Sequence, residues 1–213
     1  MKTSCKVRKV SATRPEAGVI ASAVKVVTNG GVVVFPTTGL YGLGADALQA
    51  GPVNSVFKIK GRPAHKPILL LIKEVADLNR FVVCVPDTAL QLIRTFWPGG
   101  LTLVFRAKDS LPQGLTGGSG KIGVRLPMHP VARALVERLD GPLTGTSANV
   151  SGRPGCSDIA LLDAAVSAAA NFILDAGPLK GGPGSTVVDV TESKPVILRE
   201  GVVFRERILA ALA

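Results

Sequence analysis

The chain has few of the residues on which common catalytic chemistries depend. Among 213 residues there are two histidines and three cysteines, and no Gly-x-Ser-x-Gly or His-Glu-x-x-His string. It also lacks a Walker loop, a Gly-x-Gly-x-x-Gly element opening a helix and an acid-rich metal cluster. Triad hydrolysis, zinc catalysis and the commonest phosphate-binding loops are therefore unsupported.

The three cysteines, Cys5, Cys84 and Cys156, are too far apart to indicate a disulfide framework or a zinc site. A reducing, cytoplasmic compartment is therefore the expected location. Charged residues make up only 19% of the chain, which excludes the disordered class. The longest uncharged run, residues 26–45, holds five glycines and one proline, so it is interpreted as strand and loop rather than a membrane span. No membrane association is expected.

What the chain does have is glycine, proline and positive charge: 24 Gly, 15 Pro and a net charge of +10. Taken alone, the charge is compatible with phosphate-bearing ligands, nucleic acid or acidic membranes as partners, and of these we do not expect a membrane. Basic residues crowd the first 14 positions without the apolar stretch of a secretory signal. We expect a frayed basic tail over residues 1–13 and a single domain over residues 14–213. Organelle targeting by that tail stays open as an alternative.

The apolar pattern predicts an α/β fold with a twisted mixed sheet and flanking helices. The first helix should start at a capping box formed by Thr13 and Glu16, and strands 101–105 and 122–126 should pair antiparallel. Strands 186–190 and 196–199 should form a hairpin. Helices are predicted over residues 17–27, 53–60, 87–97, 130–139, 158–170 and 205–213, and the other strands over 32–35, 68–72, 143–146 and 172–175.

Three loops, each next to an apolar strand, are rich in glycine, hydroxyl or basic residues, as ligand-binding loops are. They span residues 36–44, 58–67 and 144–152. In the second, Lys60 and Arg62 lie in a turn where crowded positive charge favours a bound anion such as a triphosphate. The alternatives are a bulged turn with a core tyrosine in the first loop, a solvated basic turn in the second, and Ser/Thr and Asx turns in the third.

Several single residues also have an expected place. Arg125 falls in an apolar strand, where a buried arginine needs an anionic partner. His129 is expected to start a helix and His65 to lie in a surface loop. Cys84 and Trp97 are expected in the core.

Taken together, the motifs resemble the YrdC-like family of threonylcarbamoyl-AMP synthases in order and spacing. They are Pro36-Thr37-Thr38-Gly39-Leu40-Tyr41-Gly42-Leu43, Lys60-Gly61-Arg62-Pro63, Gly123-Val124-Arg125-Leu126-Pro127, Ser147-Ala148-Asn149-x-Ser151-Gly152, Ser185-Thr186-Val187-Val188-Asp189 and Leu198-Arg199-x-Gly201. The resemblance covers about residues 15–205. It implies a twisted mixed α/β sheet with a concave basic cavity.

The resemblance further implies that L-threonine, bicarbonate and ATP give threonylcarbamoyl-AMP and pyrophosphate with Mg²⁺, and that separate transfer machinery passes the product to tRNA. It gives Lys60 and Arg62 catalytic roles on the phosphates, and no protein metal ligand. The implied threonine ligands are Thr37, Arg125, Ser147 and Ser185, and the implied ATP ligands are Lys60, Arg62, Lys121, Asn149, Ser157 and Arg199.

Thr38 and Lys66 depart from residues common in that family. The main alternative function is a non-catalytic RNA-binding module that uses the basic cavity. RNA binders usually stack bases on exposed aromatic rings, and this chain has one Tyr, one Trp and seven Phe, mostly in expected core positions. Direct tRNA contact, especially by the basic N-terminal residues, remains open, as do the oligomeric state and the identity of the transfer machinery.

Overall fold

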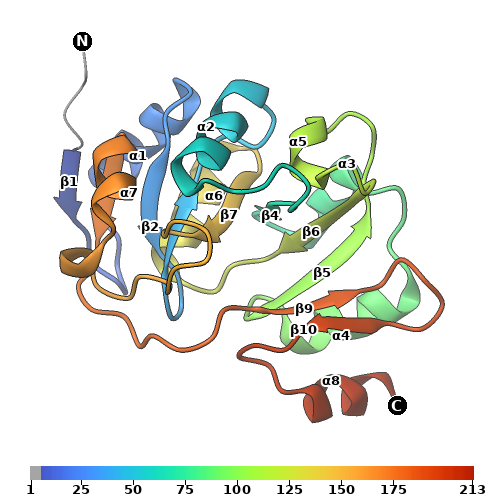
Figure 1. Ribbon diagram of the computed structural model, residues 1–213. Helices are drawn as coiled ribbons and strands as arrows, with labels where there is room; N and C mark the ends of the chain where they lie inside the picture. Colours follow the sequence, from blue (N-terminus) through green and yellow to red (C-terminus); the bar gives the residue numbers. More distant parts are fainter. Residues whose placement is uncertain (1–5) are drawn as a thin grey trace.

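The computed structural model describes residues 6–213, which form one ten-stranded mixed sheet flanked by helices (Figure 1). The strands are β1 (Lys6–Lys9), β2 (Val33–Pro36), β3 (Tyr41–Gly44), β4 (Leu69–Leu71), β5 (Leu101–Arg106), β6 (Lys121–Arg125), β7 (Leu143–Ser147), β8 (Phe172–Asp175), β9 (Thr186–Asp189) and β10 (Val196–Arg199). The helices are α1 (Ala17–Thr28), α2 (Ala50–Lys60), α3 (Leu78–Phe81), α4 (Asp87–Phe96), α5 (Gln113–Thr116), α6 (Pro130–Leu139), α7 (Ala164–Ala169) and α8 (Arg205–Leu212), with short 3₁₀ turns η1 (Val75–Asp77) and η2 (Ile159–Leu161).

The strand order is β1-β8-β2-β3-β7-β4-β6-β5-β9-β10, so the sheet mixes parallel and antiparallel neighbours as predicted. Strand β5 pairs antiparallel with β6 and parallel with β9, and β9 and β10 form the expected antiparallel pair. The centre of the sheet therefore brings together strands that are distant in the sequence: β4 pairs with β6 and β7, and β5 pairs with β9.

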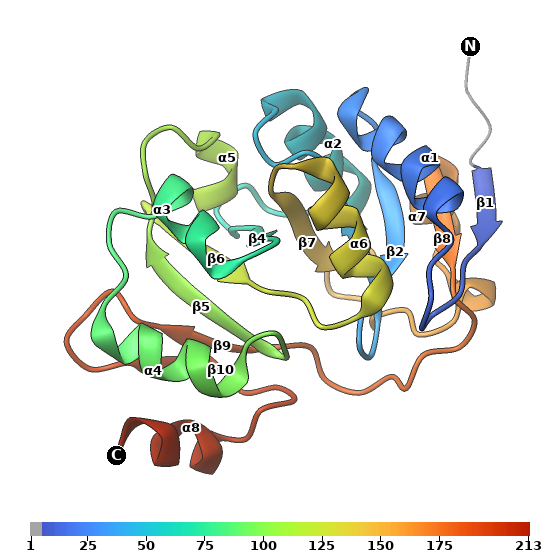
Figure 2. The same ribbon diagram turned by 180° about the vertical axis from the view of Figure 1, so that it is seen from behind.

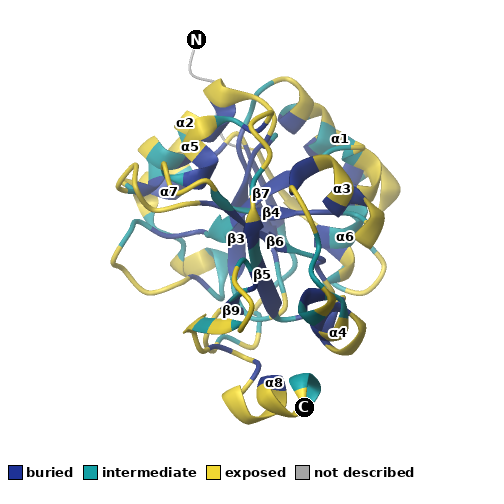
Figure 3. Ribbon diagram, turned by 90° about the vertical axis from the view of Figure 1, so that its right-hand side faces the viewer, coloured by how far each residue is buried: buried dark blue, intermediate teal, exposed yellow. Residues whose placement is uncertain are grey.

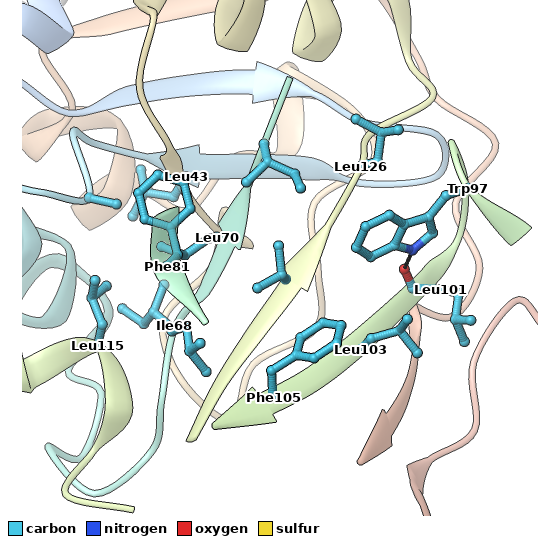
Figure 4. Packing of buried hydrophobic residues seen from close by; sticks show 14 of the residues in the cluster. Leu43, Ile68, Leu70, Phe81, Trp97, Leu101, Leu103, Phe105, Leu115 and Leu126 are labelled. Carbon is cyan, nitrogen blue, oxygen red and sulfur yellow. Dashed lines mark hydrogen bonds between the residues drawn. The ribbon is translucent and has the colours of Figure 1, made fainter. Parts of the chain in front are cut away.

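The two faces of the sheet carry separate apolar clusters, because successive side chains of a strand point to opposite sides. On β2, Val33 and Phe35 pack with α1 and α6, whereas Val34 packs in a larger cluster with α2, α5 and α7. Figure 2 shows α1 and α6 together over β2, and Figure 3 shows the buried strands between exposed outer helix faces. In the larger cluster the buried Trp97 donates its indole N–H to the Leu101 carbonyl at 2.8 Å, which confirms its core position (Figure 4).

Most predicted helices and strands are confirmed, but several local expectations are wrong. The capping box is absent, because Glu16 accepts the Ser11 amide rather than pairing with Thr13. Part of the first loop is strand β3, where Tyr41 is fully buried. Cys84 is exposed instead of lying in the core. A one-turn helix, α5, also lies in the connection between β5 and β6, where the sequence predicts no helix.

The predicted helix over 158–170 is broken into η2 and α7. Asp158 accepts the amide of Ala160 and Asp163 accepts that of Ala165, so each aspartate caps its own short element. His129, in contrast, caps α6 as expected by accepting the Val131 amide. Side-chain capping thus decides where the helices of this region start.

The N-terminal segment also differs from the expected frayed tail. Residues 6–9 form β1, which pairs in parallel with β8, although all four residues are exposed. The pairing uses backbone groups, and for this reason the charge pattern of Lys6, Arg8 and Lys9 did not indicate it. Cys5 and Lys2 lie outside the described residues, and the division at residue 13 stays a prediction.

A buried threonine joins the C-terminal segment to the sheet at the start of β9. The Thr186 hydroxyl donates to the Val203 carbonyl at 2.6 Å and accepts the amides of Gly201 and Val203 at 2.9 and 3.0 Å. Its own amide donates to the Gly100 carbonyl. One side chain therefore satisfies three buried backbone groups, and it fixes residues 200–203 beside Ser185.

We predict that Thr186→Val lowers the free energy of unfolding by about 2–3 kcal/mol, because it leaves buried backbone groups without partners. Denaturant unfolding measures the loss. Thr95→Val on the exposed face of α4, where the hydroxyl only bonds its own helix, is the matched control and should change stability by less than about 0.5 kcal/mol. Equal effects of the two changes would contradict the role given to Thr186.

Candidate functional site

A cavity of about 680 Å³ lies against the central strands of the sheet. Most of its strand residues alternate, which places them on one face of the sheet: Phe35 of β2, Leu69 and Leu71 of β4, Thr102 and Val104 of β5, Lys121, Gly123 and Arg125 of β6, Gly145 and Ser147 of β7, and Val187 and Asp189 of β9. Consecutive residues also line it at Tyr41 and Gly42 of β3, at Thr146 of β7, and at Leu198 and Arg199 of β10. The rest of the wall comes from loop residues, namely Thr37, Leu40, Arg62, Lys66, Pro67, Ile68, Ser119, Asn149, Arg153, Gly155, Gly184 and Ser185. All three predicted ligand-binding loops contribute to it.

The floor of the cavity is apolar, and glycines make this arrangement possible. A Cβ atom at Gly145 would lie 2.6 Å from Cδ1 of Leu69 and 3.0 Å from Cγ of Leu71. At Gly42 it would lie 2.9 Å from the Phe35 ring. Because these positions carry no side chain, the large apolar groups lie flat across neighbouring strands and leave the space above them open.

Cationic groups dominate the walls. Six basic side chains line the cavity, Arg62, Lys66, Lys121, Arg125, Arg153 and Arg199, against a single carboxylate, that of Asp189. Asp189 pairs with Lys121 at 2.9 Å, and Arg153 pairs with Asp163 at 2.6 Å. Within residues 6–213, Arg62, Arg125 and Arg199 have no ion-pair partner.

Arg125 is held by a carbonyl oxygen rather than by an acid. Its Nε–H donates to the Gly99 carbonyl at 2.6 Å. Burial, together with the nearby charge of Arg199, lowers the pKa of Arg125 to about 10. Both causes disfavour the charged form, so an anion beside this guanidinium would restore its ordinary pKa.

Arg62 and Arg199 are held in the same way. Arg62 donates to the carbonyls of Lys66 and Pro67 at 3.1 and 2.8 Å, and burial followed by the charge of Arg199 lowers its pKa. Arg199 donates to the Ser185 carbonyl at 2.7 Å. Arg199 is therefore close enough to perturb both Arg62 and Arg125, and backbone carbonyls fix the three guanidinium groups without neutralising them.

Lys60 does not line this cavity, although the sequence predicts a direct contact with phosphate. Its side chain is only 1% exposed, and its ammonium donates to the carbonyls of Ser147 and Asn149 at 2.5 and 2.7 Å and to Asn149 Oδ1 at 3.2 Å. Burial, with the charge of Arg62 second, lowers the pKa of Lys60 to about 8. The ammonium remains protonated at neutral pH, and its three donors are all used.

Asn149 lines the cavity, but its amide group is also used internally. Its Nδ2 donates to the carbonyls of Val150 and Arg153 at 2.9 and 2.6 Å, and its Oδ1 accepts from Lys60 and from the Ser147 hydroxyl. Lys60 and Asn149 thus form one network that shapes the loop after β7. Ser147, which also lines the cavity, is fixed by it.

The structure brings together most of the predicted site residues. Those on the cavity wall are Thr37, Arg62, Lys121, Arg125, Ser147, Asn149, Ser185 and Arg199. Lys60 lies behind the wall. Ser157 is also absent from the wall, and its carbonyl accepts the Leu179 amide at 2.8 Å. His65 lies in the exposed loop after Arg62, as expected.

Sequence reasoning missed Thr102, Arg153 and Asp189 as parts of the site and gave no role to Lys66. Thr102 is 2% exposed and is the only polar residue of the apolar run 101–105. An isolated hydroxyl in an apolar strand could have indicated a site residue. Asp189 appears in the sequence only as the last residue of a motif, and no local pattern identifies the exposed Arg153 as a site residue.

The comparisons with known proteins agree with this geometry. The family model Sua5/YciO/YrdC, described as "Telomere recombination", matches residues 25–201. A putative threonylcarbamoyl-AMP synthase of Mycobacterium tuberculosis is 39% identical over 193 residues, which cover 91% of this chain and 88% of the relative. The threonylcarbamoyl-AMP synthase of Pyrococcus abyssi is 37% identical over 85% of this chain, which spans only 54% of that relative's length.

The same fold is present in a solved structure. The crystal structure of Pyrococcus abyssi Sua5 complexed with L-threonine superposes with a TM-score of 0.92 and 35% identity, covering 97% of this chain and 60% of that one. The family model covers most of the chain, and the mycobacterial relative matches along nearly its whole length. This chain belongs to the Sua5/YciO/YrdC family.

Proposed function

We propose that this protein is a threonylcarbamoyl-AMP synthase, which converts L-threonine, bicarbonate and ATP to threonylcarbamoyl-AMP and pyrophosphate. The observation that carries the proposal is the group of three guanidiniums without acidic partners, Arg62, Arg125 and Arg199, around one cavity. Such a group needs anionic ligands, and this reaction brings a triphosphate and an amino-acid carboxylate. The activity named for the relatives supports the same assignment.

The predicted ligands divide between two substrates. For ATP we assign Arg62, Lys121 and Arg199, and for L-threonine we assign Thr37, Arg125, Ser147 and Ser185. Lys60 and Asn149, predicted as ATP ligands, act by holding the loop that carries Ser147, because their polar atoms are already paired. Ser157 does not line the cavity and receives no ligand role.

The proposed reaction does not require a covalent bond between substrate and protein. The threonine amine and bicarbonate form a carbamate with loss of water, and a carbamate oxygen then attacks the α-phosphorus while pyrophosphate leaves. No protein nucleophile takes part. Holding the reactants in line can supply roughly 7–11 kcal/mol of the barrier, and fixed cations stabilise charge that develops on the phosphates. Arg62 and Arg199 are placed for the second task.

Mg²⁺ stays a prediction that accompanies ATP. Within residues 6–213, no group of three or more His, Cys, Asp or Glu side chains could hold a metal ion. Asp189, the cavity carboxylate, already accepts from Lys121 and from Thr191. The described residues therefore do not form a metal site of their own, and Mg²⁺ would enter on phosphate oxygens as part of the substrate.

The product would pass to transfer machinery that modifies tRNA, in the cytoplasm. Among residues 6–213, no helix has the length and apolar character to cross a bilayer. Against the RNA-binding alternative, Phe204 is the one large exposed aromatic ring of the described chain, so a stacking surface for bases is missing there. Tyr41 is buried, and its hydroxyl bonds residues 176 and 177.

We predict pyrophosphate release from ATP only when L-threonine and bicarbonate are both present. The carbamate is the attacking group, so omission of either substrate should reduce release to the background rate. A coupled phosphate assay after pyrophosphatase treatment measures it. Release that ignores threonine would refute the proposal. Strongly salt-dependent RNA binding without turnover would favour the RNA-binding alternative.

We also predict that Lys60→Met and Arg62→Met both impair turnover but differ in stability. Lys60→Met should cost about 2–3 kcal/mol of unfolding free energy, because it leaves buried carbonyls unpaired. Arg62→Met removes a like charge beside Arg199 and should cost less than about 1 kcal/mol while reducing kcat/KM for ATP about 100-fold.

Denaturant unfolding and steady-state kinetics separate these two effects. Arg138→Met on the exposed face of α6 is the matched control and should change neither quantity. If Lys60→Met were as stable as the unaltered protein and failed only in ATP binding, the result would support a direct contact between Lys60 and phosphate.

A further inference from the structure

The hydroxyl groups that line the cavity differ in whether they can still donate a hydrogen bond to a ligand or only accept one. Thr37 donates its proton to the Leu40 carbonyl at 2.5 Å, and Ser147 donates to Asn149 Oδ1. A hydroxyl has one proton and two acceptor lone pairs. Toward a ligand, Thr37 and Ser147 can therefore only accept.

Ser185 has the opposite character. Its Oγ accepts the Thr102 hydroxyl at 2.8 Å and, at 3.4 Å, the Nη2 group of Arg199. Both lone pairs are directed to protein donors, and its own proton has no acceptor among residues 6–213. Ser185 is 6% exposed and lines the cavity, so the open space is where that proton can be donated.

The position of Thr102 is fixed by the sheet. Strand β5 lies between β6 and β9, and the two branches of the Thr102 side chain point to these two neighbours. Its methyl Cγ2 lies 3.2 Å from where a Cβ of Gly123 would be, so it covers that glycine on β6, while its hydroxyl reaches Ser185 at the start of β9. A β-branched residue in a strand is stiff at χ1, and the absence of a side chain at Gly123 leaves room for the methyl in this orientation.

We propose that Thr102 is a positioning residue that makes Ser185 a hydrogen-bond donor to an anionic oxygen of the amino-acid substrate. Thr102 is 2% exposed and acts through Ser185. The inference deepens the proposed function and rests on it. It assigns a direction to the bound substrate: carboxylate oxygens toward Ser185 and Arg125, and the amine or hydroxyl donors toward Thr37 and Ser147.

The test uses the full chain with Thr102→Val, which keeps the shape and removes the hydroxyl, and Thr102→Ser, which restores it. Both are made alone and together with Ser185→Ala. Isothermal titration with L-threonine gives the dissociation constant, and pyrophosphate release gives KM for L-threonine and for ATP. Circular dichroism and denaturant unfolding monitor the fold.

We expect Thr102→Val to weaken L-threonine binding about tenfold, the typical effect of one hydrogen bond to a charged group. Thr102→Ser should bind within about twofold of the unaltered chain, and KM for ATP should stay within about twofold in all variants. In the Ser185→Ala background, Thr102→Val should cause no further loss, because its effect passes through Ser185.

Three results would overturn the assignment: unchanged threonine binding in Thr102→Val, an equal loss in the Ser185→Ala background, or an equal rise of KM for ATP. The last two would show a general packing effect. Measurements on the unaltered chain distinguish the role of Thr102 from the proposed function. If pyrophosphate release by the unaltered chain does not depend on threonine, the synthase proposal fails. If its turnover is normal and Thr102→Val binds threonine equally well, only the role of Thr102 is refuted.

Discussion

The repulsion that Arg199 exerts on both Arg62 and Arg125 is the constraint on which the site depends. Each guanidinium is fixed by backbone carbonyls, those of residues 66 and 67, of Gly99 and of Ser185. Carbonyl dipoles satisfy N–H donors but do not cancel a full charge. The cavity therefore keeps a positive potential at a place partly withdrawn from water, where charge interactions are strong. The triphosphate and the carboxylate of the proposed substrates would offset it.

The fold meets this constraint through rigid supports outside the cavity. Lys60 fixes the loop after β7, and Thr186 fixes residues 200–203 beside Ser185. Neither side chain needs to touch a substrate to be indispensable. In this account, the charged groups of the site fall into two kinds: those with free hydrogen-bonding capacity that face the ligand, and those such as Lys60 whose capacity is consumed by the protein.

Much of the fold could be predicted because periodicity and glycine or proline boundaries are local signals. The structure departs from the sequence pattern where a distant contact decides the local arrangement. Strand β1 forms by backbone pairing with β8. The Lys60 ammonium is bound by the carbonyls of Ser147 and Asn149, which lie 87 and 89 residues further along the chain, and the sequence around Lys60 does not indicate these contacts. The motifs identified most of the cavity wall, but spacing along the chain does not reveal which polar atoms are already paired.

A crystal structure of this protein with bound L-threonine would show how the substrate lies among these groups. We expect carboxylate oxygens within about 3 Å of the Arg125 guanidinium and of Ser185 Oγ, with the amine near Thr37 and Ser147. The reverse orientation, with the amine against Ser185 and the carboxylate away from Arg125, would contradict this expectation.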